Sequence, residues 1–359
     1  MSNPTVSLVR RRSRPLRRED AESLWFVTTR IEDEVFWLHP LLSSRLRPAN
    51  RRACRAIARK RKGLDGQLAR LVRRRNQRCA GLMPPITIAQ AKVRAENLVV
   101  GALARAQAFC ARDGAPPVQI FAVVVMSNHL HLVLRAPAKN LSSFMGYFKK
   151  RIAHDINMLR GRRGHVFSRR FDAQPIFGHE AARQRVAYTL RNPVKSKLVR
   201  CPTQWPGFVA VAGMHDESEL RCRYFDATAW QQAKQPEDRE PFWRELTLTL
   251  SPLPGHEDQT PDDYLREALA WRYGQADQDP PRVLGIDKVL DTSFDARPPR
   301  SKRSCRPYAF GSRQDLELHR ERMGRCALLY DECRERQRRG ERDIRWPEGM
   351  YPPGASTAA

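Results

Sequence analysis

Apolar residues follow one another most closely in the middle of the chain, over residues 121–134 (FAVVVMSNHLHLVL). β-Branched and aliphatic residues in such a run predict a single buried strand. Side chains two residues apart in a strand lie on the same face. We therefore expect His129 and His131 to share one face at the end of this strand, while the leucines that alternate with them lie beneath helices on the other face.

The spacing of apolar residues elsewhere predicts several further elements. A strand is predicted over residues 25–29, and an amphipathic helix over residues 141–159, whose apolar side chains recur on one face. These apolar residues are Phe144, Phe148, Ile152, Ile156 and Leu159. The other predictions are a mostly helical stretch over 47–112, a turn and short strand within 166–177, a helix over 180–191 that Pro193 ends, and a charged helix over 314–338.

Composition adds a candidate class of partner. The chain has 359 residues and a formal net charge of +26, which favours polyanions such as nucleic acid. No apolar run approaches the length of a membrane-spanning helix, so no membrane partner is expected. The arginine-rich start lacks the apolar region of a secretory signal, and the eight cysteines form no C-x-x-C pair. Reduced thiols and a cytoplasmic, nucleoid-associated location are therefore the expectation.

The charge is unevenly distributed, and this divides the chain. Residues 1–80 contain 21 Lys/Arg against 7 Asp/Glu, and residues 140–200 contain 14 against 3. Residues 214–299 reverse the sign, with 10 Lys/Arg against 18 Asp/Glu. The reversal near residue 213 is the main predicted boundary. The predicted units are a flexible basic arm over 1–21, a domain over 22–212, an acidic, Pro-rich, mixed or irregular extension over 213–312, and a C-terminal helix and tail over 313–359.

The two histidines are a candidate metal site. Two imidazoles held on one face of a rigid strand can bind one divalent cation. An arbitrary H-x-H pair more often forms only hydrogen bonds, because so short a pattern occurs by chance. Here the pair follows a long apolar run in a strongly basic chain. This context favours a metal bound by His129 and His131.

A candidate nucleophile lies on the helix predicted over residues 180–191. Val186 and Leu190 mark its buried stripe, whereas Tyr188 lies off that stripe, one helical turn before Asn192. A phenol ionises near pH ~10, so it needs a metal or a base to act as a nucleophile. Asn192 offers an oxygen that a hard cation would accept. For any single tyrosine the more frequent role is a half-exposed, hydrogen-bonded side chain, and Tyr147 on the preceding basic helix is a rival nucleophile.

With these motifs the sequence resembles the single-tyrosine transposases of the HUH superfamily, and most closely the REP-associated tyrosine transposases. Residues 126–134 (MSNHLHLVL) match the family's Ser-Asn-His-hydrophobic-His strand. Residues 188–195 (YTLRNPVK) match its Tyr-x-x-x-Asn-Pro-Val helix end. Residues 164–171 (GHVFSRRF) look like the Gly-hydrophobic-aromatic segment with paired arginines that lies between them. The resemblance covers roughly residues 22–212.

The resemblance implies an α+β fold, a ferredoxin-like antiparallel sheet backed by helices, to which this chain would add a helical insertion at about 47–112. It further implies that Mg²⁺ or Mn²⁺ is bound by His129, His131 and Asn192. Tyr188 would attack a phosphodiester of single-stranded DNA, near hairpins or repeats, and form a 5′-phosphotyrosine. Two departures are the long helical stretch and Ile152, which stands where the family often has Tyr.

Basic residues near these motifs are candidate DNA contacts, because guanidinium and ammonium groups bind phosphates. For Arg169 or Arg170 taken individually, a solvated basic surface is an equally good explanation. The candidates are Arg169, Arg170, Lys149, Lys150, Arg151 and Lys195. The sequence leaves open two other functions, namely a nucleic-acid-binding protein that has lost catalysis and a metal-dependent nuclease that uses water. It also leaves open a homodimer, in which Tyr188 would act in its own subunit or in the partner's.

Overall fold

The computed structural model describes most of the chain, and everything below concerns those residues. They are 17–40, 55–56, 58–60, 64–80, 85–167, 170–273, 283–299 and 309–353. Most of the predicted basic arm and Arg169 lie outside them. Among the helices in these ranges, none is both long enough and apolar enough to cross a membrane.

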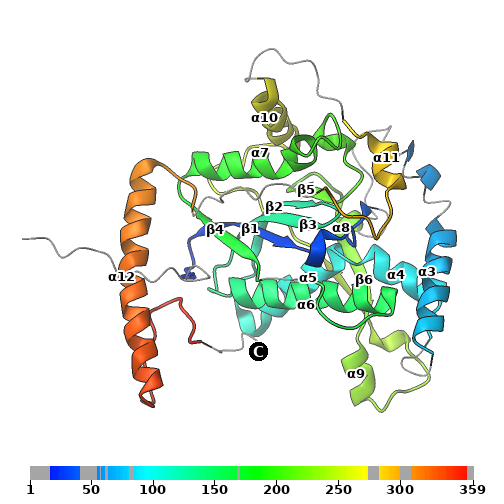
Figure 1. The fold of residues 1–359 in the computed structure, drawn as a ribbon, viewed down its shortest axis with the longest axis horizontal. Helices are drawn as coiled ribbons and strands as arrows, with labels where there is room; N and C mark the ends of the chain where they lie inside the picture. The colour runs from blue at the N-terminus through cyan, green and yellow to red at the C-terminus, as the bar shows by residue number, and fades with distance from the viewer. Residues whose placement is uncertain are drawn as a thin grey trace, which may run out of the picture.

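A five-stranded antiparallel sheet, ordered β4-β1-β3-β2-β5, is the centre of the fold (Figure 1). Helix α5 connects β1 to β2, and helix α6 connects β3 to β4, so each crossover passes over one intervening strand. Two such interleaved units are the ferredoxin-like arrangement, and the predicted α+β fold class is confirmed. The strands are β1 (Leu24–Arg30), β2 (Gln119–Val125), β3 (His129–Arg135), β4 (Asp172–Ile176) and β5 (Val209–Val211).

The apolar run at 121–134 is not one strand, and in this respect the sequence prediction is wrong. It forms the two strands β2 and β3, joined by a tight turn that contains Ser127 and Asn128. Serine and asparagine favour turns because their side chains bond to nearby backbone, and the amide of Met126 donates to the carbonyl of His129 at 2.8 Å. The two histidines therefore lie at the beginning of β3 rather than at the end of a longer strand.

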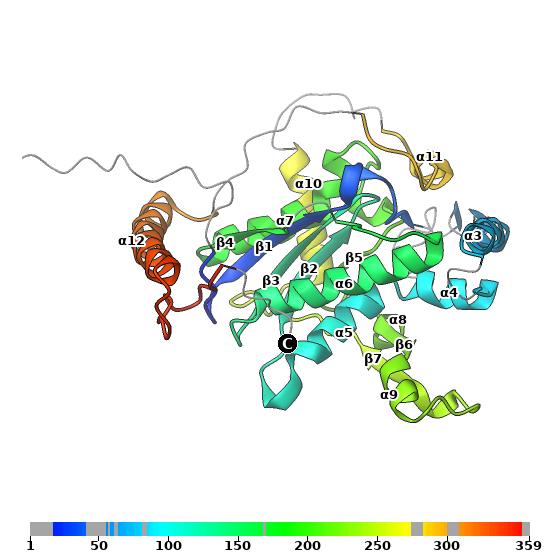
Figure 2. The same cartoon turned by 60° about the horizontal axis from the view of Figure 1, so that its bottom comes forward.

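The expected division of faces on β3 is nevertheless present. Leu130, Leu132 and Leu134 are fully buried in one cluster with residues of α5 (Val100–Cys110) and α6 (Leu141–Arg160). On the other face, Val133 packs in a second cluster with residues of α7 (His179–Lys195) and α10 (Pro261–Tyr273). Figures 1 and 2 show the sheet between these two helical layers. The apolar stripe predicted for the helix at 141–159 is buried along its whole length.

Helix α7 extends beyond the predicted end. Proline lacks an N–H and should deprive the Thr189 carbonyl of its helical partner. The helix nevertheless continues through Pro193 to Lys195. Beyond the proline the backbone hydrogen bonds resume, since Ser196 donates to the carbonyl of Asn192 and Leu198 to that of Pro193, each at 3.0 Å. The residues on either side of the proline, Asn192 and Val194, are buried.

The stretch predicted as mostly helical contains α3 (Leu64–Arg78), α4 (Ile88–Glu96) and α5. The last of these is the crossover helix of the sheet itself.

Two elements after residue 212 also join the main core, because Leu220 of α8 and Cys222 of β6 lie in the same cluster as α5 and α6. The domain boundaries remain predictions. The remaining elements are α8 (Glu217–Leu220), β6 (Arg221–Phe225), α9 (Ala227–Gln232), β7 (Trp243–Thr247), α11 (Ile286–Asp291), α12 (Arg313–Arg338) and short 3-10 turns at Glu32–Glu34, Arg112–Gly114, Pro202–Gln204 and Glu240–Phe242.

Candidate active site

The two histidines lie side by side on the sheet face that α7 covers. Their ring centroids are 5.0 Å apart, and His131 is 5% exposed. Each ring has its Nδ1 in a hydrogen bond, that of His131 with Oγ1 of Thr28 at 2.8 Å and that of His129 with Oδ1 of Asn128 at 2.6 Å. In metal sites the second ring nitrogen of a histidine typically holds such a partner, which orients the ring. A cation would accordingly be bound through Nε2 of each ring.

Strand β1 supplies the groups that orient His131. Thr28 lies directly opposite His131 in the register of the two strands, and Phe26 lies on the same face two residues away. The Phe26 ring is stacked on the His131 ring, with centroids 5.1 Å apart and planes 14° from parallel. The sequence showed the first strand, but the importance of Thr28 and Phe26 depends on a register that the sequence did not show.

Helix α7 places Tyr188 over this same face. The Tyr188 ring meets Phe26 edge-on at 5.7 Å between centroids, and its centroid is 6.2 Å from that of His131. The tyrosine is half-buried and packs against the cluster beneath α7. The rival Tyr147 is stacked on Phe109 at 4.6 Å, in the helical layer on the opposite side of the sheet. Of these two tyrosines, Tyr188 is therefore the one beside the histidines.

Two cations surround the phenol of Tyr188. Lys195 Nζ donates a hydrogen bond to the Tyr188 Oη at 3.1 Å. The guanidinium of Arg185 lies over the ring, with Cζ 4.9 Å from the centroid. Burial lowers the pKa of Arg185, and the nearby Tyr188 partly offsets this effect. A positive environment of this kind would attract a phosphate toward the phenol oxygen.

Asn192 lies one helical turn after Tyr188 and is 5% exposed. Its side-chain oxygen is buried and has no hydrogen-bond partner among the residues that the structure describes. Two residues later, Val194 packs in one cluster with Met126 of the hairpin that leads into His129. This end of α7 therefore shares an apolar cluster with the hairpin that precedes β3. A buried oxygen without a partner carries a desolvation cost that a bound cation would remove, so Asn192 fits a metal ligand.

The candidate ligand set combines two histidines with an amide. No group of three or more His, Cys, Asp or Glu side chains that could hold a metal occurs in the described part of the chain. The set proposed from the sequence has two histidines and an amide, so its third donor is of another type. The amide oxygen and added water fit a hard cation such as Mg²⁺ or Mn²⁺. The imidazole nitrogens are softer donors than these oxygens.

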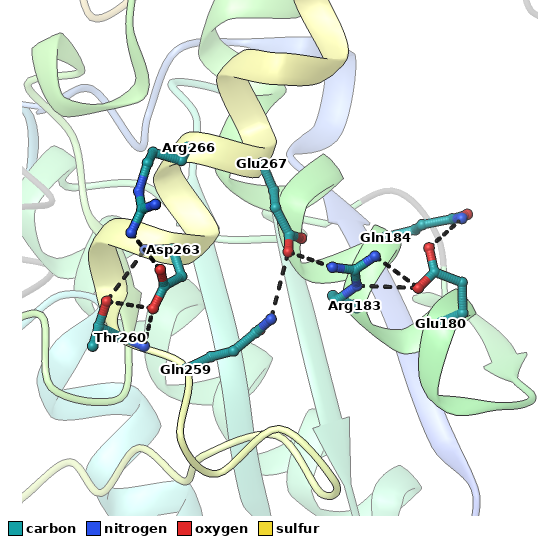
Figure 3. Close-up of polar contacts among 8 residues, drawn as sticks. All are labelled: Glu180, Arg183, Gln184, Gln259, Thr260, Asp263, Arg266 and Glu267. Atoms are coloured by element: carbon teal, nitrogen blue, oxygen red, sulfur yellow. Dashed lines mark hydrogen bonds and ion pairs between the residues drawn. The ribbon is translucent and has the colours of Figure 1, made fainter.

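Contacts with α10 hold α7 in place over the sheet. Arg183 of α7 donates to Glu267 of α10 at 2.7 Å and to Glu180 on its own helix at 2.8 Å (Figure 3). Gln259, just before α10, donates to the same Glu267 at 3.5 Å. Such half-exposed ion pairs contribute little free energy, at most ~1 kcal/mol each. Beneath them, Leu265 and other apolar residues of α10 pack into the cluster that includes α7.

The predicted DNA-binding residues lie in separate regions of the fold. Lys195 is brought to Tyr188, as described above, whereas Lys149, Lys150 and Arg151 lie on α6, in the layer on the far side of the sheet. Burial and the nearby Arg17 lower the pKa of the Lys149 ammonium to about 8. Burial also lowers the pKa of Arg151.

Arg17, which was predicted to belong to the flexible basic arm, contacts the segment that leads into β4. Arg170 is exposed there, and Arg169 lies outside the described residues. The guanidinium of Arg17 donates to the carbonyl of Phe171 at 3.1 Å and lies 4.0 Å from the centroid of its ring. Burial and the neighbouring Arg170 lower the pKa of Arg17 to about 9. One arginine among several in a basic arm gave no sequence signal for this contact.

No protein-family model and no curated protein matches the chain. One solved structure is similar, that of a REP-associated tyrosine transposase bound to a REP hairpin. The similarity covers 55% of this chain and 82% of the other, with 20% sequence identity and a TM-score of 0.31. At that level the likeness carries no argument about function, which depends on the geometry of the site.

Proposed function

We propose that this protein is a metal-dependent enzyme that cleaves and rejoins single-stranded DNA, with Tyr188 as the nucleophile. The observation that carries the proposal is that the histidine pair and Tyr188 lie together on one face of the sheet. The His129 and His131 pair comes from β3, and Tyr188 comes from α7 with its ring 6.2 Å from that of His131. Asn192, on the same helix, contributes a buried oxygen without a partner among the described residues.

His129, His131 and Asn192 would hold the cation. When bound, a divalent ion would supply positive charge to a non-bridging oxygen of the scissile phosphate and so favour attack at phosphorus. The hydrogen bonds that the Nδ1 atoms of His129 and His131 make with Asn128 Oδ1 and Thr28 Oγ1 keep the two imidazoles oriented, so little reorganisation is needed when the ion enters. The amide oxygen of Asn192 and added water suit Mg²⁺ or Mn²⁺, whereas the two imidazoles also suit softer ions such as Zn²⁺.

In the proposed reaction Tyr188 Oη attacks the phosphorus atom of a phosphodiester. A new bond forms between Oη and phosphorus, and the bond between phosphorus and O3′ breaks. The phenol proton is released, and the departing 3′-oxygen takes up a proton, so that one strand ends in a free 3′-OH. The other strand remains attached as a 5′-phosphotyrosine. Because the phosphodiester energy is kept in this linkage, a 3′-OH can reverse the step and join strands without ATP.

DNA as the substrate agrees with the charge of the molecule. The net charge of +26 attracts a polyanion from a distance, and Lys195 and Arg185 place positive charge at the nucleophile itself. A single strand is proposed because an unpaired backbone can bend to bring one phosphate between a metal and a tyrosine, whereas a duplex must first be opened.

The test is a denaturing gel of the wild-type protein incubated with a labelled single-stranded oligonucleotide and Mn²⁺. We expect a band that migrates as protein joined to DNA and that disappears when EDTA replaces Mn²⁺. Cleavage without a covalent band would contradict Tyr188 as nucleophile and indicate a nuclease that uses water. A shift on a native gel, with neither cleavage nor adduct, would contradict catalysis and indicate a binding protein.

Lys195 gives a second prediction, as a residue that positions the phenol. Lys195→Met should slow adduct formation roughly ten- to hundredfold, since a hydrogen bond to a charged group contributes ~1.5–3 kcal/mol. Affinity for the oligonucleotide should change much less. Single-turnover rates and equilibrium binding separate the two effects. Lys197→Met is the matched control, because Lys197 is exposed and lies two residues further on. Equal loss of rate in both variants would show that Lys195 acts only through general charge.

A further inference from the structure

A second basic site lies outside the candidate active site, in a cavity of about 340 Å³. It is bounded by α3, by the end of α6 and by the segment that follows α11. Helix α3 can approach closely because α6 is followed by Gly161, where a Cβ atom would come within 2.7 Å of Arg75 Cγ. The basic side chains that line the cavity are Arg70, Arg74, Arg75, Arg78 and Arg160.

Positive charge in this cavity exceeds the negative charge that faces it. Two carboxylates line the cavity, of which Asp295 forms an ion pair with Arg160 and Asp291 one with Lys60. Burial, together with Arg162 and Arg78, lowers the pKa of Arg160 to about 10. The Nη1 atom of Arg160 is buried and has no hydrogen-bond partner in the described part of the chain. An anion in the cavity would satisfy this donor and offset the repulsion among the guanidinium groups.

The arrangement of the arginines favours a chain of phosphates over a single one. Arg70, Arg74 and Arg78 are four residues apart on α3, so they follow one another along one face at steps of about 6 Å. All three are exposed on the helix surface, at the edge of the cavity. One phosphate could contact one or two of these guanidinium groups, whereas a backbone with successive phosphates could contact the whole row.

This cavity lies at the same end of the sheet as the histidines. Phe294, which lines it, meets His39 at 4.8 Å between ring centroids, and Phe36 donates to the carbonyl of Ala296 at 3.0 Å. The amide of Leu38 in turn donates to the carbonyl of Ser127 at 2.9 Å, in the hairpin just before His129. Residues 36–39 therefore connect the segment that lines the cavity with the hairpin that precedes the histidines.

We infer that the arginine row of α3 and the adjoining cavity bind the phosphodiester backbone of the nucleic-acid strand outside the cleavage site. The inference rests on the proposed function for the identity of the strand, and it assigns to α3 a role in holding DNA rather than in chemistry. The cavity also has an aromatic wall in Phe294, on which an unpaired base could stack.

The test measures binding of a twenty-nucleotide single strand, without metal, over a series of salt concentrations. In Arg74→Ala/Arg78→Ala the slope of log affinity against log salt should fall by about 1.4, because each lost phosphate contact on a single strand lowers it by ~0.7. At 0.1 M salt the same arithmetic gives a loss of affinity of about 25-fold. Arg73→Ala is the control, since Arg73 is an exposed neighbour on α3 that does not line the cavity.

A wild-type slope in the double variant, with thermal unfolding unchanged, would overturn the inference. So would a mononucleotide that displaced the oligonucleotide through the same arginines, because the cavity would then hold a small phosphate ligand. The outcome is separable from the proposed function, since no cleavage occurs without metal. The wild-type protein could form no adduct with Mn²⁺ while the slope of log affinity against log salt still falls in Arg74→Ala/Arg78→Ala. In that case the proposed catalysis would be wrong and the proposed binding site would stand.

Discussion

Tyr188→Phe should eliminate the covalent protein–DNA adduct, with a fall in cleavage rate of ~10⁴-fold or more, the scale on which loss of a nucleophile acts. The substitution removes one oxygen and leaves the ring on Phe26, where its centroid lies 5.7 Å away. Stability should therefore change little, although Lys195 loses its acceptor. Affinity for the oligonucleotide should also remain, because it depends on Lys and Arg charge. Denaturing gels and thermal unfolding of the same preparations measure both effects.

The matched control for this variant is Tyr147→Phe. Tyr147 is also half-buried, is stacked on an aromatic ring and loses the same atom, but it lies in the helical layer on the far side of the sheet. We expect its adduct to form at the wild-type rate. If instead the adduct persisted in Tyr188→Phe and vanished in Tyr147→Phe, the nucleophile would be misassigned, and α6 rather than α7 would carry it.

His131→Ala should abolish cleavage that depends on Mn²⁺ and should remove the binding of Mn²⁺ itself, as followed by calorimetry without DNA. The imidazole is expected to bind the ion through Nε2 while Thr28 holds its Nδ1. Affinity for single-stranded DNA at low salt should stay close to that of the wild type. Normal heat of Mn²⁺ binding and normal cleavage in this variant would rule out His131 as a ligand.

Loss of His131 also removes a ring that is stacked on Phe26 and 5% exposed, so the variant could lose stability. His129→Ala avoids this problem, because His129 is only half-buried at the beginning of β3. It should lose Mn²⁺ binding in the same way while its unfolding temperature changes less. A stable His129→Ala that still bound Mn²⁺ with wild-type affinity would contradict the proposed ligand set, whatever the fate of His131→Ala.

The sequence by itself predicted features that depend on local spacing. Alternation along residues 129–134 placed His129 and His131 on one face and the leucines on the other, because side chains of a strand alternate whatever lies next to it. Helical spacing likewise predicted the buried stripe of α6. The prediction that Tyr188, Asn192 and the histidines act together came from their resemblance to a family, since the spacing of the residues alone does not join distant segments.

The tertiary structure decided features that depend on contacts between distant segments. The turn at Ser127 and Asn128 divides one apolar run into two strands, because pairing of β2 with β3 satisfies backbone groups that a single strand would leave open. The register of β1 against β3 selects Thr28 as the partner of His131. Helix α7 continues through Pro193, and the residues on either side of the proline are buried.

For the candidate nucleophile too, the sequence predicted the local position and the tertiary structure decided its neighbours. The sequence showed that Tyr188 lies off the apolar stripe of its helix, which is a property of helical geometry alone. It did not show that this side of the helix lies beside His131, or that the oxygen of Asn192 is buried without a partner among the described residues. Those facts depend on which face of the sheet α7 covers. Helix α7 lies on this face because its apolar residues are buried there together with those of α10 and of the sheet, which come from distant parts of the chain.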